Sequence, residues 1–322
     1  MLATVLNGLQ LIVAIPYLYI VITKSPPELI VYRNTLLNHS LWFFLWLMWL
    51  ESGCGGSVGF VDGTVCLSLH GFMSIIARDD INTPIIIMLI ISLNFILSLI
   101  ICFTFRYIQL AHPMLISKIS SSRGVFLLVA AHILFSFLGF LTAQIIIGIT
   151  TERHALGVVY CCVDPTVQFH IFLFLSVIFV FAGFICLSFV ILTFLCIRFF
   201  HRHMSMMTTK TYRLQLLLTV NLILLTVLPV VFEVIPFAII SVVAYAQHPS
   251  LSSVADVALT VPLGDGLLSC LLTLGFVTPY RKYLHRVVRK VLNVLFKRSS
   301  SVSFGVHVSN CNAGNVFSGA NK

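Results

Sequence analysis

Long apolar runs separated by short polar segments dominate the chain. Seven of these runs approach or exceed the roughly 20 residues with which an α-helix crosses a hydrocarbon core about 30 Å thick. The predicted spans are residues 2–23, 34–50, 83–105, 124–148, 168–197, 214–244 and 259–278. The pattern therefore predicts an all-α membrane protein whose fold is a seven-transmembrane helix bundle.

The stretch between the second and third predicted spans does not fit a spanning helix. Residues 67–77 are apolar but too short to cross the bilayer, so we interpret them as part of an extracellular loop or a re-entrant segment. The glycine-rich GCGGSVGFVDG before them precedes no phosphate-binding helix, and we interpret it as a flexible loop.

The composition supports a bilayer location. Hydrophobic residues make up 59% of the chain and charged residues only 9%, against roughly a quarter charged in a soluble domain. The first apolar run lacks the basic start of a cleavable signal and is typical of a signal anchor. HExxH, GxSxG and phosphate-loop lysine motifs are absent from the sequence, so we predict no enzyme, cofactor or metal site.

The positions of the basic residues predict the orientation. With the N-terminus outside, 17 of the 19 Lys and Arg fall on the cytoplasmic side, and only Arg78 and Arg153 remain outside. This asymmetry is the positive-inside rule, so we expect a multi-pass plasma-membrane protein with an outer N-terminus and a cytoplasmic C-terminus. The net charge of +9 is then a topology signal, and we predict no nucleic-acid partner.

Two acids fall inside predicted spans, Glu233 in the sixth and Asp265 in the seventh. Both lie in the outer half of the bilayer at similar depth by the helical rise. Ionisable groups in a bilayer usually face a cavity or a partner. They could therefore line a pocket for a polar or cationic small molecule. They could equally be structural, protonated or hydrogen-bonded to neighbours such as Ser269 or Asn94.

Arg106 and Tyr107 end the third predicted span on its cytoplasmic side. The arginine could be an anchor that snorkels to the interface, or a switch that pairs inside the bundle in one state and meets a partner in another. The third cytoplasmic loop carries Arg202 and Lys210 beside the same inner end. Prolines in the sixth and seventh spans, Pro229, Pro236 and Pro262, predict kinks that act either as hinges or as fixed packing.

The residues after the seventh span predict an amphipathic helix over about 281–298. Its apolar residues recur at helical spacing, and basic residues cover the other face. We expect it to lie in the inner interface on anionic lipids, after Pro279 ends the seventh helix; the alternative is a basic tail that is only locally ordered. The predicted domains are thus a transmembrane domain, residues 1–298, and a disordered cytoplasmic tail, residues 299–322.

Four cysteines lie outside the membrane in this topology: Cys54, Cys66, Cys161 and Cys162. The extracellular side is oxidising, so a disulfide between the two loops is expected. The sequence leaves open which pair forms it.

Four motifs, in the expected order over about residues 10–290, resemble one known family. They are KSPPELIVYRNTLLN, FRYIQLAHP, TKTYRLQLLLTVNLILLTVLPVVFEVIP and VTPYRKYL. The chain is similar in these to the nematode serpentine chemoreceptors, in particular the Str superfamily and its Srd class. The region around residues 52–82 departs from that pattern, as does the absence of Asp-Arg-Tyr and Asn-Pro-x-x-Tyr.

The resemblance implies a G-protein-coupled receptor of sensory neurons, in their cilia, that detects a small environmental or pheromone-like molecule. It implies that Arg106 and Tyr107 lie at the end that couples to a heterotrimeric G protein. It also matches Pro229 to the sixth-span proline and Pro279, Tyr280 and Arg281 to the end of the seventh span. Two alternatives remain, a ligand-gated channel or transporter, and a receptor copy that does not couple; the odd number of spans disfavours most transporters.

Overall fold

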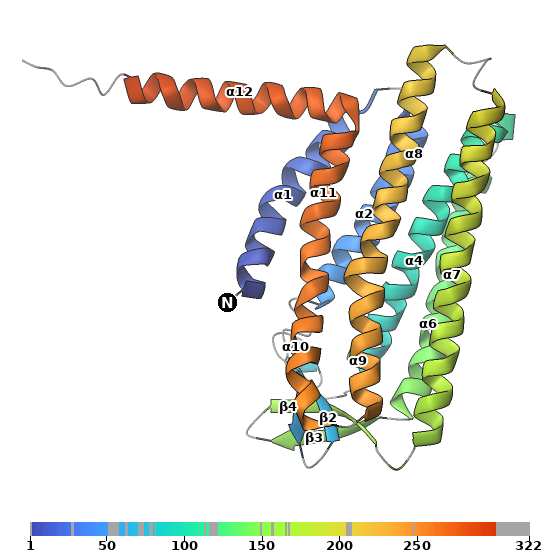
Figure 1. Cartoon of the computed structure of the whole chain (residues 1–322), viewed down its shortest axis with the longest axis vertical. Coiled ribbons are helices and arrows are strands. Elements are labelled where there is room, and N and C mark those ends of the chain that lie inside the picture. The colour runs from blue at the N-terminus through green and yellow to red at the C-terminus, as the bar shows by residue number, and fades with distance from the viewer. Residues whose placement is uncertain are drawn as a thin grey trace, which may run out of the picture. The chain divides into compact units, whose positions relative to one another are not determined.

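The fold is seen in a computed structural model that describes residues 2–26, 29–50, 58–61, 64–69, 74–76, 80, 82–112, 114–115, 122–148, 150–155, 158–164, 166, 168–203, 208–246 and 248–300. Its α-helices, shown in Figure 1, are α1 Leu2–Lys24, α2 Ile30–Met48, α4 Asn82–Ala111, α6 Ser122–Ile147, α7 Gln168–His203, α8 Thr209–Pro229, α9 Ile235–Ala246, α10 Ser252–Thr260, α11 Asp265–Phe276 and α12 Thr278–Ser300. Chain contacts divide the protein into two units, Met1–Arg281 and Lys282–Lys322.

The mostly helical membrane fold predicted from the apolar runs is confirmed, but the count of seven spans stays a prediction. Among the described residues, five helical stretches are long and apolar enough to cross a membrane: Asn82–Ala111, Gly124–Ile147, Ala182–Arg202, Tyr212–Ala246 and Ser252–Phe276. The described apolar stretch of α1, Gly8–Lys24, is shorter. Helix α2 contains the polar residues Arg33, Asn34, Asn38 and His39 and is not one of these five stretches.

The sixth predicted span is interrupted in its middle, and the seventh is interrupted near its start. A π-helix, η5 Val230–Val234, separates α8 from α9, and a 3₁₀-helix, η7 Val261–Gly264, separates α10 from α11. Pro229 ends α8 and Pro262 lies within η7, as expected of residues that remove a backbone donor. These breaks matter because Glu233 lies in η5 and Asp265 is the first residue of α11.

The centre of the bundle is an apolar core shared by α2, α4, α7 and α8. Its buried side chains are Phe43, Leu47, Phe95, Leu99, Cys102, Phe103, Phe189 and Leu222. Helices α4 and α6 approach especially closely at Gly139, where a Cβ atom would lie 3.0 Å from the Ile90 Cα atom. Many apolar side chains on the outside of the helices are exposed, as expected of a lipid-facing surface.

The all-α prediction is wrong in one respect, because the described strands form a four-stranded antiparallel sheet. The strands are β1 Val58–Val61, β2 Thr64–Leu69, β3 Thr150–Ala155 and β4 Val158–Val163, in the order β1-β2-β4-β3. They lie together at one end of the helix bundle (Figure 1). Strand β1 falls within the glycine-rich stretch predicted to be a flexible loop, and β2 takes the start of the apolar segment 67–77.

Asp80 caps the start of α4. Its carboxylate accepts a 2.8 Å hydrogen bond from Thr83 Oγ1 and a 3.0 Å bond from the Asn82 N–H. These bonds to Thr83 and Asn82 favour the charged form and hold the pKa of Asp80 below its ordinary value. Asp80 thus satisfies backbone and side-chain donors at the helix start.

Candidate functional site

The structure brings the two predicted membrane acids together. Glu233 from η5 and Asp265 from α11 lie close enough for their charges to interact. Asp265 is 0% exposed, and its Oδ1 atom accepts a 3.1 Å hydrogen bond from Ser269 Oγ. The bond to Ser269 matches one structural alternative left open by the sequence. Asn94, the other neighbour considered, instead bonds to Ser136 and His132 at 2.9 and 2.7 Å.

Several polar atoms around the two acids are buried without a hydrogen-bond partner among the described residues. They include Glu233 Oε1, Asp265 Oδ2, Gln10 Oε1 on α1 and Trp46 Nε1 on α2. The Trp46 indole approaches the Glu233 carboxyl but does not reach hydrogen-bond geometry. A buried polar group without a partner costs free energy. Their grouping is therefore typical of a binding site more than of a packed core.

A separate groove of about 460 Å³ lies between α9 and α10, lined by apolar side chains and Ser253. Val231 and Ile235 line it, and they lie two residues to either side of Glu233. Because side chains two residues apart point to nearly opposite sides of a helix, the groove and the acid face opposite ways. The groove faces outward and offers little for a polar molecule.

At the other end of the bundle, Arg106 is buried and links α4 to α8. Only 2% of its surface is exposed. Its Nη2 atom donates to the Gln215 backbone oxygen at 2.6 Å, and its Nε atom donates to Thr219 Oγ1 at 3.3 Å. Its Nη1 atom donates to Gln109 Oε1 at 3.0 Å within α4. The arginine is therefore not a snorkelling anchor in this conformation but an interhelical hydrogen-bond donor.

The other residues predicted at this end are spread over four helices. Tyr107 packs against the cluster of Leu110, Cys196 and Phe200, which joins α4 to α7. Arg202 is exposed at the end of α7, and Lys210 lies in the first turn of α8. Pro279, Tyr280 and Arg281 form the start of α12, after Val277 breaks the helix with an extended backbone.

Tyr280 ties the end of the seventh predicted span to the link after α1. Its side chain is 0% exposed, and its hydroxyl lies 2.7 Å from Ser25 Oγ. A second long-range bond runs from Asn221 Nδ2 on α8 to the Tyr32 hydroxyl on α2 at 2.8 Å. Polar contacts thus join α1, α2, α4, α8 and α12 at the Arg106 end of the bundle.

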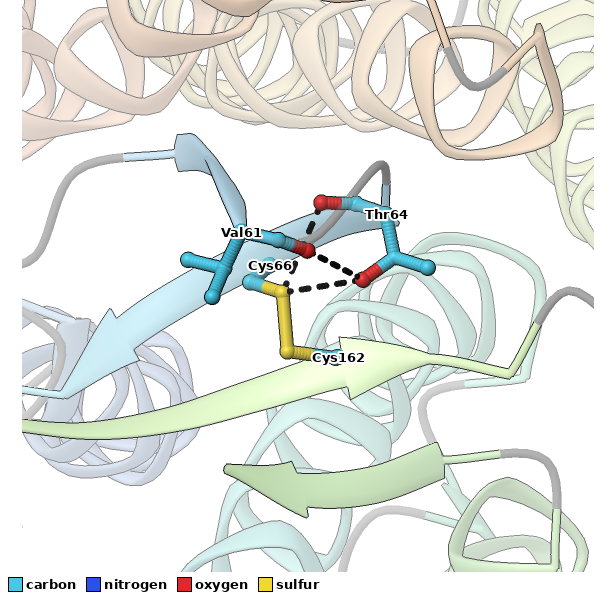
Figure 2. Close-up of a disulfide and its surroundings, with 4 residues drawn as sticks. All are labelled: Val61, Thr64, Cys66 and Cys162. Atoms are coloured by element: carbon cyan, nitrogen blue, oxygen red, sulfur yellow. Dashed lines mark hydrogen bonds between the residues drawn. A yellow bond between two sulfur atoms is a disulfide. The ribbon is translucent and has the colours of Figure 1, made fainter. Parts of the chain in front are cut away.

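The disulfide that the sequence left open joins Cys66 to Cys162 in the structure. The two residues are direct partners in the register of β2 and β4, with Cα atoms 4.0 Å apart. Figure 2 shows the bridge crossing between the strands, with Thr64 Oγ1 donating to the Val61 backbone oxygen at 2.8 Å. Cys54 lies outside the described residues.

Sequence reasoning missed Gln10, Trp46, Gln215 and Thr219. The signal for Gln10 was available, since it is an amide inside the first apolar run and is buried to 6% exposure. Gln215 acts through its backbone oxygen, and no sequence pattern points to such a partner. Among the described residues there is no group of three or more His, Cys, Asp or Glu that could hold a metal.

The chain was then compared with known proteins. The family model described as "Serpentine type 7TM GPCR chemoreceptor Srh" matches residues 1–290. No match was found among curated proteins. The serpentine chemoreceptor resemblance is thus confirmed, and the placement in the Srd class is not confirmed. This is a family of receptors and not a class of enzyme, and the channel or transporter alternative is not favoured. The protein is a multi-pass G-protein-coupled chemosensory receptor, and its chain belongs to the Srh family of serpentine seven-transmembrane chemoreceptors.

Proposed function

We propose that this receptor binds a small environmental or pheromone-like molecule beside Glu233 and Asp265 and couples to a heterotrimeric G protein at the Arg106 end. The observation that carries the coupling half is the burial of Arg106 with hydrogen bonds from α4 to α8. A charged guanidinium held between two helices defines one of two arrangements, and agonist would shift the bundle to the other, in which Arg106 meets the G protein. The same end of the bundle also carries Tyr107, Arg202, Lys210 and Tyr280.

The proposed topology has seven spans with the N-terminus outside. The strands β1–β2 connect α2 to α4 and β3–β4 connect α6 to α7, and both pairs share one sheet. Those two connections therefore share one side of the membrane, which we take as the outer side because extracellular cysteines form disulfides. The Ser25–Tyr280 contact then belongs to the inner side.

The basic amphipathic sequence of α12 supports a position along anionic lipids of the inner leaflet. The proposed division into a domain of residues 1–298 and a tail of residues 299–322 follows from that assignment. The disorder predicted for the tail concerns residues that lie largely outside the part of the chain that the structure describes. The proposed location is the plasma membrane of sensory neurons, in their cilia.

Arg106→Gln tests the coupling half. The purified receptor is reconstituted with heterotrimeric G proteins, and basal GTPγS binding is measured per receptor molecule. We expect the variant to fall to the level of empty vesicles while surface expression in cells stays within about twofold of wild type. Arg33→Gln is the matched control, since Arg33 bonds only to the adjacent Asn34 among the contacts described. Wild-type GTPγS binding with Arg106→Gln would exclude this role.

Glu233→Gln and Asp265→Asn, separately and together, test the ligand half. A screen of volatile and water-soluble compounds on cells expressing the wild-type chain supplies the agonist. We expect each variant to raise the half-maximal concentration and the double variant to abolish the response at normal surface expression. An unchanged response of the double variant would remove these acids from the pocket.

A further inference from the structure

Three of the unpartnered atoms at the Glu233–Asp265 site are of one chemical kind and come from three different helices. Glu233 Oε1 from η5, Asp265 Oδ2 from α11 and Gln10 Oε1 from α1 are all hydrogen-bond acceptors, and all are buried without a partner among the described residues. We name these three residues the acceptor cluster. Asp265 and Gln10 are more than nine-tenths buried, at 0% and 6% exposure.

Gln10 lies directly against the start of α11, at a position where Gly266 has no side chain. A Cβ atom on Gly266 would lie 2.6 Å from the Gln10 Oε1 and Cδ atoms. The amide oxygen therefore occupies the space that any larger residue at position 266 would fill, next to Asp265 in the chain. Helix α1 also packs against α11, which fixes this neighbourhood.

The unpartnered oxygen acceptors determine which chemical groups a ligand must offer to bind here. In a membrane interior, a carboxylate without a partner is costly, and a ligand that supplies hydrogen-bond donors and positive charge removes that cost. A primary ammonium group has three N–H donors and one positive charge. The Trp46 indole beside Glu233 adds an aromatic surface of the kind that attracts cations.

We propose that the acceptor cluster binds the protonated amine of the receptor's ligand, with N–H groups donating to Gln10 Oε1, Glu233 Oε1 and Asp265 Oδ2. This amine proposal rests on the proposed ligand position beside Glu233 and Asp265. It adds the chemical class of ligand that this position selects. The ligand class is therefore a primary amine, in contrast to the neutral alcohol or ester of the same skeleton.

Small ammonium ions test the site without knowledge of the natural ligand or of G-protein coupling. The melting temperature of the purified receptor is measured in increasing ammonium, methylammonium and ethylammonium chloride, with sodium and potassium chloride at equal ionic strength. We expect at least one of the organic ammonium ions to raise the melting temperature saturably, above the effect of both metal salts. Equal stabilisation by sodium chloride, or none by any ammonium ion, overturns the proposal.

Variants locate the effect. In Glu233→Gln with Asp265→Asn, the ammonium-dependent shift should vanish, and in Gln10→Leu the half-saturating concentration should rise at least threefold. Each shift is compared within one variant, so altered baseline stability does not enter. Asp80→Asn, at an exposed helix cap, is the control and should keep the full shift. Retention of the shift in the double acid variant overturns the proposal. A neutral agonist from the screen, if the receptor's response to it still requires both acids, would support the proposed ligand position and overturn the proposal that the ligand is an amine.

Discussion

The Arg106 guanidinium and the Gln215 backbone oxygen are 2.6 Å apart, which joins the third and sixth predicted spans. Thr219, one turn further along α8, accepts the Arg106 Nε–H at 3.3 Å and donates to the same Gln215 oxygen at 3.1 Å. The contact is therefore a small network in which a threonine hydroxyl connects the charged side chain to the helix backbone.

Thr219→Val should loosen this network without removing the charge. Valine keeps the shape of threonine and loses only the hydroxyl that Arg106 bonds. Interhelical hydrogen bonds in membranes average about 0.6 kcal/mol, which corresponds to roughly a threefold change in a two-state equilibrium. If the network holds the resting state, basal GTPγS binding should rise about threefold. Thr142→Val is the control, since that hydroxyl bonds only within its own helix, to the Leu138 oxygen.

Gly139→Ala should destabilise the receptor by forcing α4 and α6 apart. The added methyl would meet backbone atoms of Ile90 and Leu89 at 3.0 to 3.2 Å, and backbone cannot move aside as a side chain can. Overpacking of this kind costs about 1–3 kcal/mol. Thermal denaturation in detergent should show a lower midpoint. Gly183→Ala has nothing within 4 Å of the new atom and should leave the midpoint unchanged or slightly higher. Equal midpoints for the two variants would contradict the close approach.

The helical part of the fold could be predicted from the sequence because a spanning helix requires a continuous run of about 20 apolar residues. The predicted spans 83–105 and 168–197 fall inside helices α4 and α7, and the predicted span 214–244 overlaps α8 and α9. The sheet was not predicted, since its strands are short and the GCGGSVGFVDG stretch has turn composition. Pairing of β2 with β4, remote in sequence, is what makes these segments strands.

The site was predicted in part for a related reason. Glu233 and Asp265 stand out because charge is rare in apolar runs, and the prolines indicate broken helices around them. The π-helix at Val230–Val234 could not be foreseen, since Pro229 predicts a kink but not the added residue in the turn. The burial of Arg106 against the Gln215 backbone could not be predicted, because it depends on packing that no local pattern encodes.

The disulfide assignment distinguishes two adjacent cysteines and can be tested directly. The register places Cys162, not Cys161, opposite Cys66, because neighbours in a strand point to opposite faces. Cys162→Ser should therefore abolish the cross-loop bridge, and Cys161→Ser should leave it intact. Non-reducing peptide mapping by mass spectrometry measures this, with the reduced sample as reference. A Cys66–Cys161 peptide from the wild-type receptor would contradict the register.

Strand β1 is attached to α10 by a carboxylate and to α9 and α10 by an apolar cluster. The Val58 N–H donates to Asp256 Oδ1 at 2.6 Å, and the Val58 side chain packs with Val243 and Ala255. A hydrogen bond to a charged group contributes about 1.5–3 kcal/mol. Asp256→Ala should therefore speed amide hydrogen exchange in β1 about tenfold or more, while the apolar cluster keeps the sheet in place.

Hydrogen exchange followed by mass spectrometry on a peptide spanning 58–61 measures this attachment. Asp256→Asn keeps an oxygen acceptor but no charge, so its exchange rate should fall between those of the wild type and the alanine variant. Asp80→Ala serves as control because the Asp80 hydrogen bonds stay with Asn82 and Thr83 at the start of α4. Wild-type exchange in Asp256→Ala would mean that the apolar cluster alone holds β1.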